Sequence, residues 1–115
     1  MDLGIRSTVI EGVPVLCLDG EADLASLPRL HEQVRRFVRE NPGRHVVVDL
    51  DGLGHLDPVT VGVLVGARLQ ARAGGGDLQL VCTSPPVAAV FTGSGLDSSF
   101  VLHHSVADAA VPDAP

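Results

Sequence analysis

Carboxylates gather in the middle of the chain, and they are the first residues whose types and spacing could do chemistry. Asp49 and Asp51 fall at the end of the apolar run "HVVVDL", and Asp57 follows shortly after. One interpretation is that an aspartate at a strand end accepts a phosphoryl group. The sequence excludes lysine-assisted chemistry of that kind, because all eight basic residues are arginine.

A phospho-accepting aspartate suggests the receiver domain of response regulators, but this sequence does not fit the receiver pattern. Receivers use an essential lysine near the acceptor, and this chain has none. Receivers also carry an acidic magnesium-binding cluster early in the chain, whereas the early segment "IRSTVIEG" contains a single carboxylate. We therefore reject that interpretation.

No other catalytic or metal motif is found. The histidines form no HExxH, and the adjacent His103 and His104 on a predicted strand point to opposite faces. The glycine run 74–76 follows a helix instead of opening one, so it does not predict a phosphate cradle. Cys17 and Cys82 lie in apolar runs and are expected to be buried thiols. The sequence predicts a protein that is not an enzyme, with no cofactor and no metal.

Length and composition predict one packed domain over residues 1–115, with 111–115 as a frayed tail. The chain is 45% hydrophobic, with three phenylalanines and a net charge of −6. This composition opposes nucleic-acid binding, which needs a basic surface and favours stacking aromatics. No apolar stretch approaches the roughly 20 residues that span a bilayer, and the first twelve residues do not resemble a signal peptide. We expect a cytoplasmic protein without direct membrane insertion.

Hydrophobic periodicity and turn residues predict the order β-β-α-β-α-β-α-β-α. "IRSTVIEGVPVLCLDG" is typical of a hairpin that turns at Glu11-Gly12, and Ser26 is expected to begin the first helix. The remaining expected elements are strand 45–50, loop 51–56, helix 58–73, strand 77–82, helix 84–91, strand 99–104 and helix 105–111. This order predicts an α/β fold with a mostly parallel sheet of four or five strands. The first strand should be antiparallel at an edge, with about four helices predominantly on one face.

The segments "VVVDLDGLGHLDPVTVGVLVGA" and "GGGDLQLVCTSPPVAAVFTGSGLDSSF" resemble STAS domains, and more narrowly bacterial anti-sigma-factor antagonists. The resemblance extends over nearly the whole chain and includes the "GEAD" loop and the "SGL" at 94–96. It implies a STAS fold and a protein partner that is both anti-sigma factor and serine kinase. In that family the partner phosphorylates the serine after the aspartate at the start of the second helix, and the phosphate abolishes binding. The resemblance places this phosphoserine at position 58, where this chain has proline.

Asp57-Pro58 is a good helix start on physical grounds alone. The Asp57 carboxylate is expected to accept a hydrogen bond from the N–H of Val59 or Thr60, a cap worth about 1 kcal/mol. Pro58 then occupies the first helical position, where proline costs little. The substitution removes the hydroxyl, so position 58 is not phosphorylatable, and Thr60 is the weak alternative phosphosite.

A helical wheel of the second helix, with Arg68 and Arg72 taken as the exposed side, predicts the docking surface. On this wheel Thr60 falls on the buried side, whereas Val61 and Val65 point outward beside Arg68, with Pro58 near the rim. The residues predicted to bind the partner are Asp23, Asp57, Pro58, Val61, Val65 and Arg68.

Three functions remain open at this point. The first is a non-enzymatic, anti-sigma-factor-antagonist-like regulator, monomeric or weakly dimeric, that is not switched at Pro58. The second is a STAS subunit of a membrane transport complex docked on an ATPase. The third is a STAS module that senses a nucleotide or another small ligand. The absence of lysine and the acidic loops oppose nucleotide binding.

Overall fold

The computed structural model describes residues 2–93 and 100–110, which form one five-stranded sheet in the order β1-β2-β3-β4-β5. β1 pairs with β2 antiparallel, and the remaining neighbours pair in parallel. The predicted α/β architecture is therefore confirmed, including the antiparallel edge strand. The elements are β1 (Gly4–Ile10), β2 (Val13–Ala22), α1 (Leu27–Glu40), β3 (His45–Leu56), α2 (Val59–Ala73), β4 (Asp77–Val81), α3 (Pro85–Gly93), β5 (Leu102–His103) and α4 (Val106–Ala110).

A tight turn joins β1 to β2, as the sequence predicts. Ile10 faces Val13 in the register, which leaves Glu11 and Gly12 as the two loop residues. Their φ angles are 51° and 82°. Two successive positive φ angles are characteristic of the type I′ turn, whose twist matches that of the flanking strands. The hairpin is thus fixed locally by Glu11-Gly12.

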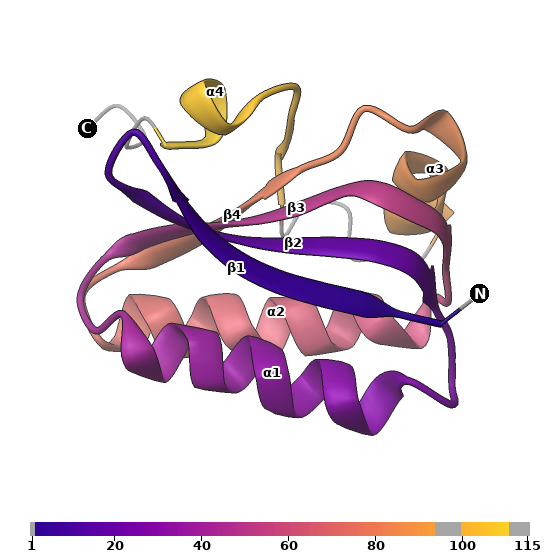
Figure 1. Cartoon of the computed structure of the whole chain (residues 1–115), viewed down its shortest axis with the longest axis horizontal. Helices are drawn as coiled ribbons and strands as arrows, with labels where there is room; N and C mark the ends of the chain where they lie inside the picture. Colours follow the sequence, from indigo (N-terminus) through magenta and orange to yellow (C-terminus); the bar gives the residue numbers. More distant parts are fainter. Residues whose placement is uncertain (1, 94–99, 111–115) are drawn as a thin grey trace.

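The two long helices pack side by side against one face of the sheet (Figure 1). α1 contributes Leu30, Val34 and Phe37 to the main core, and Phe91 of α3 joins the same core. α4 is the exception, because its Ala109 packs in a small cluster on other strand residues, namely Val15, Val47 and Val81. The expected one-face arrangement holds for the two long helices, whereas α4 lies on the opposite face and α3 lies near the carboxyl ends of the strands (Figure 1). No helix in the described ranges is long and apolar enough to cross a membrane.

The third strand is longer than the sequence suggests. The sequence predicts a loop over residues 51–56. Instead β3 continues to Leu56, and its second half pairs with β2 from Asp19↔Gly52 to Ala22↔Leu56. Leu53 and Leu56 are buried. Tertiary pairing with a long neighbour overrides weak local strand propensity.

Element boundaries elsewhere differ modestly from the prediction. α1 begins after Ser26, as expected, and α2 begins at Val59, one residue later than predicted. The last strand is only Leu102–His103, shorter than the predicted 99–104. The "SGL" at 94–96 and the expected tail 111–115 lie outside the described residues.

Candidate functional site

The carboxyl ends of β2 and β3 lie together at one end of the sheet, on the right in Figure 1, and each strand leads into a helix there. The Asp57 N–H donates a hydrogen bond of 2.7 Å to the Ala22 carbonyl. This bond ties the start of α2 to the end of β2. The carboxyl ends of parallel strands are the usual location of binding sites in α/β folds.

The start of α2 has the predicted cap. The Asp57 carboxylate accepts a hydrogen bond of 3.0 Å from the Val59 N–H. Pro58 has φ −53° and ψ −30°, which are helical values, so its ring fits the first helical position. The Thr60 N–H donates to the Asp57 carbonyl at 2.9 Å. Asp57 thus satisfies two backbone donors that a helix start leaves without intrahelical partners.

Thr60 is inaccessible, as the sequence predicts. Its side chain is fully buried, with 0% exposure. Its hydroxyl donates a hydrogen bond of 2.6 Å to the Asp57 carbonyl. A kinase could reach this hydroxyl only if the start of α2 unfolded.

The predicted outward face of α2 is wrong. Val61 is 0% exposed and belongs to the main core. Val65 is half-buried and packs against the same core. The physical reason is that α2 contacts both β4 and α1, so it buries a wide arc of its circumference. The exposed residues of α2 are Val59, Gly62, Leu69, Arg72 and Ala73. Arg72 is the one polar residue among them, so the sequence marks this side only weakly.

Arg68 is one of the two arginines that set the phase of the predicted wheel, and it is also turned inward, whereas Arg72 is exposed as expected. Its Nε lies 2.9 Å from Oδ1 of Asp77, and its guanidinium lies 5.4 Å from the ring centroid of Phe100. The ion pair is largely buried, with side-chain exposures of 16% and 8%. Arg68 therefore holds α2 to β4, and its predicted role in partner binding is not supported by its position.

Asp77 is the centre of a polar network within the fold. Besides Arg68, it accepts hydrogen bonds from the Leu78 N–H at 2.8 Å and from Gln79 Nε2 at 2.8 Å. Gln79 Oε1 lies 3.2 Å from Nε2 of His103 on β5. Burial by itself raises the pKa of Asp77, but the bonds to Arg68, Leu78 and Gln79 outweigh it and lower the pKa. The carboxylate stays charged and links α2, β4 and β5.

Asp23 organises the loop between β2 and α1. Its N–H donates to Ser26 Oγ and its Oδ1 accepts from the Ser26 N–H, both at 3.0 Å. The backbone hydrogen bond from Ser26, followed by the side-chain bond from the same residue, lowers the pKa of Asp23. This reciprocal pair fixes the loop and holds the adjacent Leu24 outward, where it is 64% exposed.

The other strand carboxylates have structural partners. Asp49 Oδ1 accepts a hydrogen bond of 2.9 Å from the Asp51 N–H. Asp51 Oδ1 in turn accepts from the Thr83 N–H at 2.6 Å and from the Thr83 hydroxyl at 3.1 Å. These bonds attach β3 to the segment that precedes α3. In the part of the chain that the structure describes, no three histidine, cysteine or acidic side chains are placed to hold a metal ion.

A surface with two exposed apolar side chains remains at the carboxyl end of the sheet. Leu24 is 64% exposed and Val59 is 44% exposed, and the sequence prediction missed both. Pro58 and Gly62 are exposed beside Val59 on α2. We call the group the carboxyl-end surface, and it consists of Asp23, Leu24, Asp57, Pro58, Val59 and Gly62. Large exposed apolar residues next to carboxylates can dock a protein.

Known proteins match this chain over most of its length. The STAS domain family matches residues 5–109. The chain belongs to the STAS domain family.

Several proteins that resemble this STAS chain are named as anti-sigma factor antagonists. A curated protein named anti-sigma F factor antagonist, from Paenibacillus polymyxa, is 27% identical over 96 residues, or 84% of this chain and 82% of that protein. An anti-sigma factor antagonist from Mycobacterium paratuberculosis superimposes with a TM-score of 0.82 at 24% identity, covering 94% of this chain and 91% of that one. The antagonist SpoIIAA in its unphosphorylated form gives 0.70 at 21% identity, covering 94% and 92%. These similarities confirm the predicted family, and the solved structures confirm the fold.

Some residues of the carboxyl-end surface could be recognised from the sequence of this STAS chain, and others could not. Asp57 and Pro58 were recognisable because capping chemistry is local. Leu24 follows the "GEAD" motif and could have been noted as an apolar residue inside a polar loop. Val59 could not have been separated from Val61 by residue type, since only packing distinguishes valines two positions apart.

Proposed function

We propose that this STAS protein is a non-enzymatic regulator of the anti-sigma-factor-antagonist type. Its partner would be an anti-sigma factor with serine-kinase character, and it would meet that partner in the cytoplasm. The family membership and the curated relative named anti-sigma F factor antagonist support this function. No observation in the structure favours the transport-complex or small-ligand alternatives.

We infer that the carboxyl-end surface is the docking surface. The observation that carries this proposal is the exposure of Leu24 and Val59 at adjoining strand ends, with Asp23 and Asp57 beside them. Both side chains are presented by rigid backbone, because hydrogen bonds fix the Asp23–Ser26 loop and the start of α2. A preformed apolar surface loses little conformational entropy when a partner covers it.

Binding at this surface would not be switched by phosphorylation at position 58. The resemblance to antagonists places the regulated serine at this position, and Pro58 has no hydroxyl. A phosphate would add about −1.5 to −2 charges at the centre of the surface. Thr60, the nearest hydroxyl, is buried and hydrogen-bonded to the Asp57 carbonyl. The proposed regulator therefore stays in its binding-competent state even when a kinase is active.

The docking surface can be tested with two matched leucines. Leu24 and Leu69 are each 64% exposed, but Leu69 lies in the second half of α2, away from the proposed surface. Calorimetry with the anti-sigma factor encoded nearest to this gene should show that Leu24→Lys weakens binding about thirtyfold, as expected for an anchor residue worth roughly 2 kcal/mol. Leu69→Lys should bind like the native chain. Equal affinities for both variants would refute the docking surface.

The missing switch can be tested by restoring a serine. Native protein and the Pro58→Ser variant are incubated with the same anti-sigma factor and ATP, and their intact masses are measured. We expect no phosphate on the native chain and one phosphate on Pro58→Ser, because that hydroxyl would be exposed at a capped helix start. A stoichiometric phosphate on the native chain would show that the protein is switched at another residue.

A further inference from the structure

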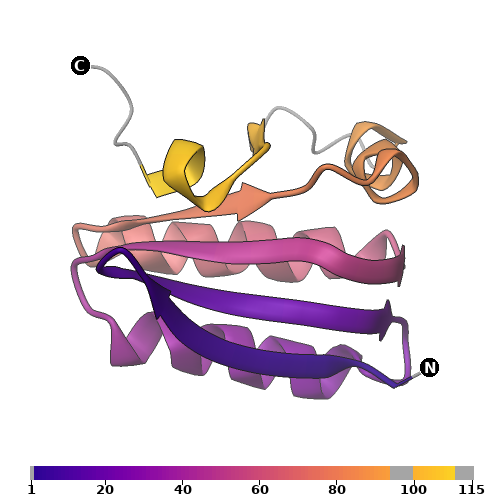
Figure 2. The ribbon, with the colours of Figure 1, turned by 45° about the horizontal axis from the view of Figure 1, so that its top comes forward.

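β1 is an edge strand with regular geometry along its whole length. Its seven residues pair with β2 without a bulge, and among the described residues nothing pairs with its outer side (Figure 2). Edge strands usually resist association through proline, lysine, bulges or inward charges. β1 has none of these, and Arg6 is its only charged residue. The outer side of β1 is therefore able to accept another strand.

The hairpin turn determines which backbone groups of β1 point outward. In a two-residue hairpin the pair that flanks the turn exchanges hydrogen bonds, so Ile10 bonds to Val13. Hydrogen-bonded and non-hydrogen-bonded pairs then alternate along the strand. Ile5, Ser7 and Val9 fall on the alternate positions, so their N–H and C=O groups face away from β2. Pro14 lies opposite Val9, at a position where no hydrogen bond to β1 is needed.

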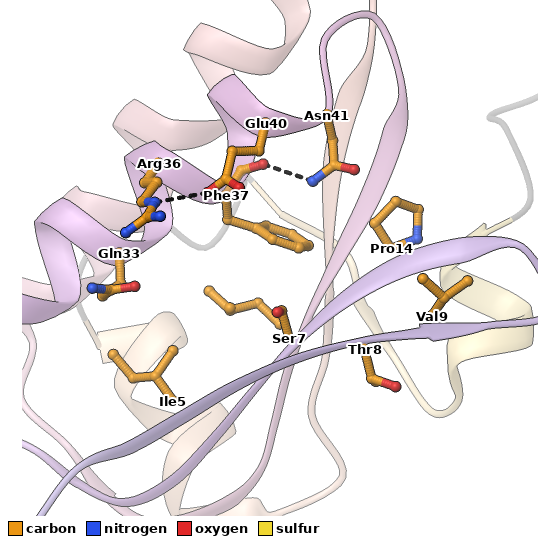
Figure 3. A pocket seen from close by; sticks show the side chains of 11 residues that line it. Ile5, Ser7, Thr8, Val9, Pro14, Gln33, Arg36, Phe37, Glu40 and Asn41 are labelled. Atoms are coloured by element: carbon orange, nitrogen blue, oxygen red, sulfur yellow. Dashed lines mark hydrogen bonds and ion pairs between the residues drawn. The ribbon is translucent and has the colours of Figure 1, made fainter.

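The side chains of the same three residues line a cleft between β1 and α1 (Figure 3). The cleft has a volume of about 330 Å³, and Phe37 of α1 is part of its wall. Val9 is 65% exposed, so the cleft is not filled from within the chain. An added strand could bring further side chains over it.

The helical wall of this cleft carries both signs of charge. Arg36 Nε and Glu40 Oε1 form an exposed ion pair of 2.8 Å on α1, and Gln33 lies beside them. If two copies of the chain were related by a two-fold axis at this edge, the wall of one copy would approach the same wall of the other. The Arg36 and Glu40 charges cancel within each wall, so the two walls would not repel each other through a net charge. The wall is therefore electrostatically compatible with itself.

We propose that two copies of this chain dimerise by antiparallel pairing of β1 with β1, centred on Ser7. The sequence around Ser7 is symmetric in character, with Arg6 and Thr8 on either side and Ile5 and Val9 beyond them. In this register Ser7 faces its own copy, Ile5 faces Val9 of the second copy, and Arg6 faces Thr8. All six outward N–H and C=O groups of Ile5, Ser7 and Val9 gain partners, and apolar residues meet across the cleft.

A second copy fits this edge better than an unrelated strand, because the register produces no like-charge pair. Arg6 of one copy lies opposite Thr8 of the other, two positions away from the second Arg6. The seven-residue interface is small, so the dimer should form at high protein concentration and dissociate on dilution. The two carboxyl-end surfaces lie at the strand ends and are not part of the paired edges.

Cysteine cross-linking tests the register. Directly opposed residues of a hydrogen-bonded antiparallel pair have Cα atoms about 5.5 Å apart, which a disulfide can span. Ser7→Cys should therefore give a covalent dimer under air with copper-phenanthroline, oxygen accepting the two electrons that two thiols lose. Val9→Cys is the matched control, because two copies of Val9 would be roughly 13 Å apart or more. Cross-linking of Val9→Cys or of the native chain to the same extent as Ser7→Cys would overturn the register.

Sedimentation velocity over a concentration series tests the dimer itself. The native chain should sediment faster as concentration rises, and Val9→Lys should remain monomeric. Val101→Lys is the control, because Val101 is 68% exposed beside β5 at the opposite edge of the sheet. It should behave like the native chain. A native chain that stays monomeric at every concentration, or equal weakening by both lysines, would overturn the proposal.

Discussion

Val61→Asp should unfold the domain, whereas Val59→Asp should leave it folded. Val61 is 0% exposed in the main core, and Val59 is 44% exposed in the first turn of the same helix. Losing the burial of a valine side chain costs about 1.5–3 kcal/mol. Burying a carboxylate without a partner costs several kcal/mol more. The total, roughly 5 kcal/mol or above, equals the whole stability of many domains.

The same charge at Val59 meets different surroundings. The side chain has access to water, and an acidic group in the first turn of a helix interacts favourably with the helix dipole, by about 0.3–1 kcal/mol. Far-UV circular dichroism and urea unfolding of the two variants would give the comparison directly. If Val61→Asp unfolded at the native urea midpoint, the packing of α2 described above would be incorrect. The inward assignment of Thr60 would then fail with it.

Two further substitutions test the polar network around Asp77 and the close approach of Gly20 to the backbone of Asp2. Asp77→Asn should lower the free energy of unfolding by about 3 kcal/mol at pH 7, because Arg68 loses its buried charged partner. Since the pKa of Asp77 is lowered in the fold, its contribution is present above the unfolded pKa of about 4. The difference between native and variant should therefore shrink as pH falls through the lower folded pKa, which urea titrations across that range would show. Gly20→Ala should lower the melting temperature markedly, because Gly20 has φ +83° and an added Cβ would overlap the Asp2 carbonyl; an unchanged melting temperature would contradict that contact.

Local chemistry determined much of this fold in advance. Glu11-Gly12 specifies the hairpin, Asp57-Pro58 specifies the start of α2, and the glycines after Ala73 specify its end. Alternation of strands and helices then leaves few topologies, because parallel strands require right-handed crossovers. These features depend on residues close together in the chain, so they could be predicted without knowledge of the packing.

The direction in which α2 faces was decided by tertiary structure alone. Its residues are mostly valine, alanine and glycine, so the helix has no clear polar side, and Arg68 gave a false indication of the exposed one. In the fold that arginine turns to Asp77, a residue nine positions away on β4. Val61 is buried because α2 packs against both the sheet and the neighbouring α1, and Val59 is exposed because it precedes that contact. The sequence by itself determined where the helix begins, and only the packing of distant elements determined which of its side chains a partner can reach.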